Sequence, residues 1–252
     1  ESARSYEVLD AKGRLLANAA QASRKDARDA VGAASKALSG WAGATAYNRG
    51  QVLYRVAEVM EGRHAQFSDE VARAEGLTAA KARAQVDAAI DRWVWYAGWS
   101  DKLAQVAGAV NPVAGPYFNL SLPEPTGVVA VLAPQASSLL GLVSVIAPVI
   151  VAGNTCVVVA SQTRPLPAIT LAEVLATSDV PGGVVNTLTG FTAELAPWLA
   201  SHEDVAAIDL AGAIELDWAA LEAAAAQTLT RVVRPGEGLD GASDGETGWA
   251  AT

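Results

Sequence analysis

Five short apolar runs, rich in β-branched residues, recur through the second half of the chain. They are GVVAVLA, TCVVVA, GVVNTLT, VAAIDLA and LTRVV, and segments with helical spacing separate them. Alternation of buried strands with helices is typical of a parallel sheet covered by helices on both faces. The pattern therefore predicts an α/β fold for residues 127–233.

The residues before this repeat predict helices and a small β element. Two short strands are expected in residues 5–16, around a turn at Asp10 to Gly13. Proline-rich residues 112–126 follow the helices, and their YFNLSL stretch alternates like an exposed edge strand. We expect four helices before the sheet, at residues 23–38 with Ser23 as N-cap and Asp26 three positions on, 45–63, 67–74 and 78–105.

Composition excludes several classes of partner. The net charge of -9, without a basic stripe, argues against nucleic acid, which requires clustered Lys and Arg. The longest apolar run, Leu139 to Ala152, is broken by Gly141, Ser144 and Pro148 and is too short to span a membrane. A single cysteine and the lack of a signal-like start favour a cytoplasmic protein.

The residues most often used in catalysis are isolated in this sequence. Cys156 lies inside a run expected to be buried, where a thiol behaves as a small hydrophobe. His64 and His202 stand alone on polar segments, without neighbours at ligand spacing, so no metal is expected. The GEGLDG stretch at 236–241 fits a dinucleotide fingerprint formally, but the acidic ASDGETG after it is a poor helix.

Two groups of side chains on the expected helices have ordinary interpretations. Asp69, Glu70 and Glu75 are neighbours on one helix, and such charges are normally a solvated face. The aromatic group on the next helix is expected mainly to pack between helices and sheet, with part of it available to a partner chain. Its members are Trp93, Trp95, Tyr96 and Trp99.

The turn PQASS, residues 134–138, follows the most apolar run, where ligands gather in a doubly wound sheet. It offers only one amide and two hydroxyls. Together with Ser161 and Gln162, Ser137 and Ser138 could line a cleft for another small ligand. Neutral polar residues at such positions are more often solvated turn residues.

Several sequence blocks in order resemble the signature blocks of the aldehyde dehydrogenase superfamily. They are GVVAVLAP, IAPVIVAGNTCVVVASQTRPLPAITLAEVL, VPGGVVNTLTG and SHEDVAAIDLAG, and YAGWSDK resembles part of the family's N-terminal helices. The resemblance runs from about Tyr6 to Val233. It implies a Rossmann-like, cofactor-binding-type domain over 1–235, with 112–126 as a β oligomerisation segment and 236–252 as a flexible acidic tail.

Most of the family's functional positions are altered in this chain. Ala136 stands where the family has the asparagine of the oxyanion hole, and losing such a donor typically costs about 100- to 1000-fold in rate. Val159 and Gln162 replace the Lys and Glu that hold the cofactor's ribose. In the Phe-Thr-Gly-Ser block only Gly212 persists, followed by Ala213. The resemblance therefore implies a degenerate cofactor site, and we expect NAD binding to be lost.

The resemblance also implies that the catalytic groups are missing. After Val233 the family continues into a block bearing the general base and a domain bearing the nucleophilic cysteine. This chain has Arg234, Pro235 and the acidic tail instead. Thiohemiacetal chemistry requires both groups within hydrogen-bond reach. Family-16 aldehyde dehydrogenases carry such a partial module after a complete one, and the opening ARSYEVLDAKGRLLANAAQASRKDARDAV resembles its start.

These observations predict a non-catalytic module with a structural role for an active aldehyde dehydrogenase. Its expected partners are that enzyme or further copies of itself, and the exposed YFNLSL segment suits pairing by strand addition. The alternative is an NAD(P)-dependent aldehyde oxidoreductase subunit or fragment whose active site is completed by another module. Its expected ribose and phosphate contacts are almost entirely missing from the sequence.

Overall fold

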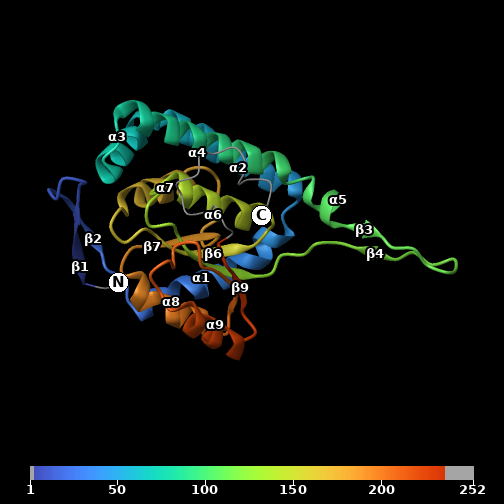
Figure 1. Ribbon diagram of the computed structural model, residues 1–252. Helices are drawn as coiled ribbons and strands as arrows, with labels where there is room; N and C mark the ends of the chain where they lie inside the picture. Colours follow the sequence, from blue (N-terminus) through green and yellow to red (C-terminus); the bar gives the residue numbers. More distant parts are fainter. Residues whose placement is uncertain (1–2, 236–252) are drawn as a thin grey trace.

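A computed structural model describes residues 3–235, in which helices pack in layers around a central sheet (Figure 1). The predictions for the GEGLDG stretch and for a flexible acidic tail fall on residues 236–252 and lie outside the described residues. A two-stranded arm projects from one end of the body, and a second hairpin lies near the N-terminus. The body of the molecule therefore carries two separate β hairpins besides the main sheet.

The central sheet has five parallel strands in the order β7-β6-β5-β8-β9. Each of the five apolar runs supplies one strand, which confirms the predicted fold class. The chain moves outward from β5 to β7 on one side, then returns to lay β8 and β9 on the other. The strands are β5 (Val128–Leu132), β6 (Thr155–Val159), β7 (Val185–Leu188), β8 (Val205–Asp209) and β9 (Arg231–Val233).

Strand β5 is buried on both faces, because helices cover the sheet on either side. All five of its residues are buried. Val129 and Val131 contribute to one hydrophobic cluster, whereas Val128, Ala130 and Leu132 contribute to the other. This alternation follows from the two-residue period of a strand. It explains why the run lacks the polar alternation of a half-exposed strand.

The two clusters correspond to two layers of helices. One layer contains α6 and α7, with α2 and α4 packed outside them, and the other contains α1, α8 and α9. Figure 1 shows these layers above and below the sheet. The helices that follow the strands are α6 (Leu140–Val151), α7 (Leu166–Ala176), α8 (Thr192–Ala200) and α9 (Trp218–Gln227).

Five helices, rather than the four expected, precede the sheet in the described chain. They are α1 (Arg24–Gly43), α2 (Ala46–Gly62), α3 (His64–Glu75), α4 (Ala79–Trp99) and α5 (Leu103–Ala107). The predicted helix over 78–105 was wrong in its length, because the chain turns after Ser100 and restarts as α5. The predicted N-cap of α1 is confirmed, since the Ser23 backbone N–H donates to Asp26 at 2.8 Å.

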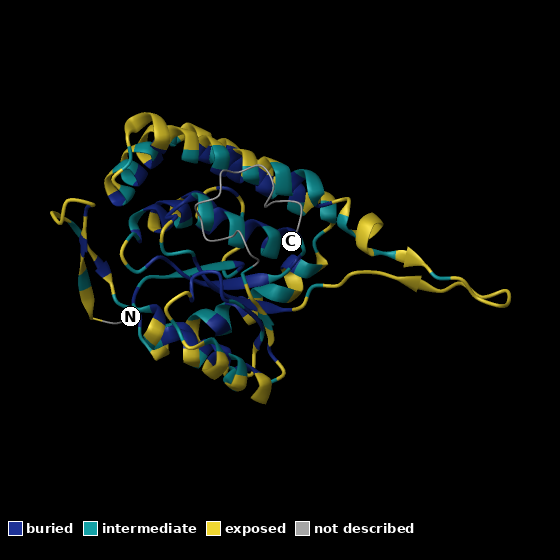
Figure 2. Ribbon diagram, in the orientation of Figure 1, coloured by how far each residue is buried: buried dark blue, intermediate teal, exposed yellow. Residues whose placement is uncertain are grey.

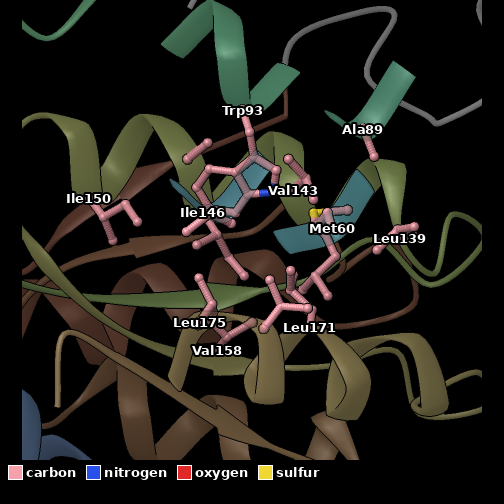
Figure 3. Packing of buried hydrophobic residues seen from close by; sticks show 14 of the residues in the cluster. Met60, Ala89, Trp93, Leu139, Val143, Ile146, Ile150, Val158, Leu171 and Leu175 are labelled. Atoms are coloured by element: carbon pink, nitrogen blue, oxygen red, sulfur yellow. The ribbon is translucent and has the colours of Figure 1, made fainter. Parts of the chain in front are cut away.

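Helix α4 places its aromatic residues largely in packing roles, as predicted. Trp93 is fully buried and points toward Val143 and Ile146 of α6 (Figure 3). The Trp95 ring lies against Tyr96 and Trp99, with centroids 4.8 Å and 5.4 Å apart. Trp93 therefore packs α4 against α6, whereas the contacts of Trp95 lie within α4 itself.

The arm begins earlier than the predicted segment 112–126. Its strands are β3 (Ala109–Val110) and β4 (Leu120–Ser121), which pair antiparallel. Figure 2 shows the arm as almost wholly exposed, and Tyr117 and Phe118 are 77% and 79% exposed. The short turn-rich sequence favours a hairpin, but only four residues pair, because prolines and glycines interrupt the remainder.

The N-terminal hairpin consists of β1 (Ser5–Leu9) and β2 (Leu15–Ala20). Its turn is held by Asp10, whose carboxylate accepts the backbone N–H groups of Lys12 and Arg14, both at 2.8 Å. Gly13 has a φ of 77°, which fits the left-handed turn position predicted from the sequence. The Ala11 backbone N–H donates to the Arg73 carbonyl, which ties the hairpin to α3.

Replacing Trp93 separates packing from hydrogen bonding in this core. Trp93→Ala is expected to lower the free energy of unfolding by about 3–5 kcal/mol, because it removes a fully buried tryptophan side chain. Trp93→Phe should cost less than Trp93→Ala, because it leaves a smaller cavity and the indole N–H that it removes has no hydrogen-bond partner within the described chain. Urea denaturation followed by circular dichroism measures both. Equal losses for the two variants would contradict this account of the core.

Candidate functional site

The most informative position in the fold is the carboxyl edge of the sheet between β5 and β8. The strand order reverses at this point, so the turns that follow the two strands diverge to opposite faces of the sheet. Open α/β sheets bind their ligands at such a switch point. The turn after β6, residues 160–165, lies beside it because β6 pairs with β5 in parallel.

Gln135 links the turn after β5 to the turn after β6. Its side-chain amide donates to the Ala133 carbonyl at 2.9 Å, and its side-chain oxygen accepts the Gln162 backbone N–H at 2.8 Å. The Ser161 hydroxyl donates to the Gln135 carbonyl at 3.0 Å. Polar groups that a ligand would use at this edge are therefore engaged in joining the two turns.

The neighbouring position of the turn carries no side-chain donor. Ala136 is exposed, and its carbonyl accepts a hydrogen bond from the Arg164 guanidinium. Val159, by contrast, is fully buried in the hydrophobic cluster formed with α1, α8 and α9. Gln162 contributes its backbone N–H to the link with Gln135. These three positions, singled out from the sequence, thus place no charged group at the edge.

A carboxylate from a distant helix sits at the start of α6. Glu75 of α3 accepts both the backbone N–H and the hydroxyl of Ser138, at 2.7 Å and 2.6 Å. Ser137 accepts the Gly141 backbone N–H at 2.8 Å. A carboxylate is stabilised at a helix N-terminus, where backbone N–H groups point outward. The same negative charge disfavours the build-up of an oxyanion at this turn.

Two expectations from the sequence are therefore corrected. Glu75 is not part of a solvated face, because it holds the Ser138 turn. Ser137, Ser138 and Ser161 are buried and bonded within the protein, not solvated turn residues. Sequence spacing could not reveal either point, since Glu75 and Ser138 are 63 positions apart.

Gly212 persists for a steric reason. A Cβ atom at this position would lie 2.0 Å from the Ala133 carbonyl oxygen. The Gly212 backbone N–H also donates to the Leu132 carbonyl at 2.7 Å, so the loop after β8 crosses directly over the end of β5. Ala213 is fully buried, and its carbonyl accepts the indole N–H of Trp218 at 2.7 Å. Both residues therefore serve the fold at this edge.

Asp209, at the end of β8, is the titratable group that the sequence analysis missed. Burial raises the pKa of its carboxyl from 3.8 to about 6, and the hydrogen bond from the Ala211 backbone N–H partly opposes this shift. The signal was available, because an acidic residue interrupts the otherwise apolar run VAAIDLA. The site thus contains a carboxyl group that takes up a proton near pH 6.

The remaining candidate residues lie apart from this edge. Cys156 is buried in β6, and burial raises the pKa of its thiol. The ring of His64 pairs with Asp87 at 2.8 Å, and His202 accepts the Asp204 backbone N–H at 3.1 Å. Residues 3–235 contain no group of three His, Cys, Asp or Glu able to hold a metal, and no helix among them could cross a membrane.

Comparison with known proteins matches residues 1–239 to the family model described as the aldehyde dehydrogenase family. The chain belongs to the aldehyde dehydrogenase family. It is 32% identical over 244 residues to the cytosolic 10-formyltetrahydrofolate dehydrogenase of Pongo abelii, covering 92% of this chain and 26% of that protein. It is 34% identical over 207 residues to the hydroxyisobutyraldehyde dehydrogenase of Mycolicibacterium austroafricanum, covering 81% of this chain and 40% of that protein.

Solved structures of the family share the same fold. A putative aldehyde dehydrogenase from Burkholderia cenocepacia matches with a TM-score of 0.85 and 28% identity, over 92% of this chain and 48% of that one. The crystal structure of PnpE in complex with nicotinamide adenine dinucleotide matches with a TM-score of 0.85 and 26% identity, over 92% and 47% of the two chains. The chain thus corresponds to a partial aldehyde dehydrogenase module and spans less than half of these family members.

The acidity of Asp209 predicts a pH-dependent stability difference. Its folded pKa lies above the ordinary value, so its stabilising contribution is present below about pH 3.8 and is lost as the pH rises through about 6. Asp209→Asn should therefore stabilise the protein relative to wild type by about 1–3 kcal/mol more at pH 8 than at pH 4.

Urea denaturation at the two pH values measures this difference. Asp91→Asn, at an exposed position of α4, is the matched control and should show little pH dependence relative to wild type. A wild-type-to-Asp209→Asn difference that is the same at both pH values would contradict the assignment of a raised pKa to this carboxyl.

Proposed function

We propose that the chain is a non-catalytic module of the aldehyde dehydrogenase family that has a structural role in assembling an active aldehyde dehydrogenase. It corresponds in this proposal to the partial second module of family-16 enzymes. Its proposed place of action is the cytoplasm. The observation that carries the proposal is a contrast between two parts of the molecule. At the switch point Gln135 joins the turns after β5 and β6 by hydrogen bonds, whereas the arm exposes apolar side chains.

The switch point supports the non-catalytic part of the proposal. The family's dinucleotide needs polar partners for its ribose, yet Val159 is apolar and fully buried, and the Gln162 backbone N–H is bonded to Gln135. These residues do not fit the cofactor, so we derive no step through it. Cys156 is the chain's single cysteine, and burial in β6 makes it unsuitable as a nucleophile.

The arm supports the assembly part of the proposal. Its exposed apolar side chains are Val110, Val113, Tyr117, Phe118, Leu120 and Leu122. Aromatic side chains of this size contribute strongly to interfaces when they become buried. The two short strands also leave backbone groups available for pairing by strand addition. The proposed partner is an active aldehyde dehydrogenase, or a further copy of this chain.

Substitutions on the arm test the assembly role. The double variant Tyr117→Asp/Phe118→Asp should abolish co-elution with a co-expressed active aldehyde dehydrogenase at micromolar concentration, because it places charge on the apolar arm. Tyr47→Asp is the matched control: Tyr47 is an aromatic residue that is 69% exposed on α2, outside the two strands of the arm. Size-exclusion chromatography with light scattering measures the complexes.

The outcomes separate the proposal from its rivals. A complex or self-oligomer formed by wild type and by Tyr47→Asp, but not by the arm variant, supports assembly through the arm. Assembly that survives the arm variant would overturn this part of the proposal. Aldehyde oxidation by the purified chain alone would overturn the non-catalytic part.

A further inference from the structure

Three side chains on α3 and α4 place a hydroxyl, an imidazole and a carboxylate in series. The His64 ring of α3 contacts Asp87 of α4 through Nε2 at 2.8 Å, and Ser68 of α3 through Nδ1 at 3.4 Å. Helices α3 and α4 pack against each other, which brings these residues together (Figure 1). None of the three belongs to the turns of the switch point or to the arm.

Helical spacing sets the pair of Ser68 and His64. Ser68 follows His64 by four positions, so the two side chains lie on one face of α3. Side chains of a helix also lean toward its N-terminus, which directs the Ser68 hydroxyl toward the ring. Their separation is longer than a usual hydrogen bond, but contacts between a nucleophile and its base are often loose before a substrate binds.

Asp87 determines which ring nitrogen of His64 carries the proton. An ionised carboxylate only accepts hydrogen bonds, so Nε2 of the neutral ring donates to Asp87. Nδ1 is then left with a lone pair that can accept the Ser68 proton. The His64 side chain is 23% exposed and Ser68 is partly exposed, so a small reagent reaches this pair from solvent.

The charges around these side chains favour an uncharged reagent. Asp87 and Asp91 carry carboxylates one helical turn apart on α4, and both are exposed. Arg63, next to His64 in the sequence, is already paired with Glu173. Fixed negative charge repels anionic acyl donors such as acyl phosphates. A small neutral ester meets no such repulsion.

We propose that Ser68 is a modification site that takes an acyl group from a small neutral ester. The Ser68 Oγ bonds to the carbonyl carbon, and the bond from that carbon to the alcohol oxygen breaks. The proton passes from Ser68 to Nδ1 of His64 and then to the departing alcohol. Asp87 is a positioning residue, because it acts through the His64 ring. The reaction ends at the acylated serine and is separate from aldehyde oxidation and from assembly through the arm.

Treatment of the full chain with p-nitrophenyl acetate, followed by peptide mass spectrometry, tests the proposal. The Ser68 peptide should be acetylated faster than the peptide containing Ser39, an exposed serine of α1 with no histidine three or four positions away. His64→Gln should slow acetylation of Ser68 at least ten-fold, because general base catalysis contributes about 100- to 10,000-fold. His202→Gln removes the other histidine of the chain and is the matched control, with an unchanged rate.

Variants of Asp87 separate positioning from a merely structural role. Asp87→Asn should slow acetylation of Ser68, whereas Asp87→Glu should restore most of the rate, because it keeps an acceptor for Nε2. Thermal denaturation followed by circular dichroism checks that each variant is folded. Acetylation of Ser68 no faster than that of Ser39, or an unchanged rate in His64→Gln, would overturn the proposal.

Discussion

The structure depends on the burial of β5 between two layers of helices. Every residue of this strand is buried, and both neighbouring strands pair with it in parallel. The loop after β8 then packs directly on the end of β5. The two backbones approach so closely at Gly212 that a side chain there would not fit. These contacts fix the carboxyl edge of the sheet, which is where open α/β sheets bind their ligands. Its geometry therefore persists independently of any catalytic group.

Retention of this geometry explains why the altered positions do not disturb the fold. Gln135 and Glu75 supply hydrogen bonds that hold the turns after β5 and β6 and the start of α6. A buried polar group that finds a partner within the protein stabilises the native turn. A polar group that is bonded in this way within the protein is no longer available to bind a ligand. These polar groups therefore form part of the scaffold that holds the two turns together.

Much of the fold followed from sequence patterns, and most of the site did not. The five strands and their helices were predictable because β-branched runs and helical spacing are local signals. The end of α4 at Trp99 was not predictable, because the helical spacing of apolar residues in the sequence continues past Ser100. The bond between Glu75 and Ser138 depends on how α3 packs against the sheet, which no local pattern encodes. Asp209 was identifiable as an oddity in an apolar run, but its acidity depends on three-dimensional burial.

The switch point retains its shape while the protein itself occupies its polar groups, through Gln135 and Glu75. Isothermal titration of the full chain with NAD tests this claim most directly. We expect no saturable heat of binding up to about 1 mM NAD. A Kd of about 1 mM would correspond to a binding free energy of roughly -4 kcal/mol. Saturable binding of NAD with a Kd below about 1 mM would contradict it.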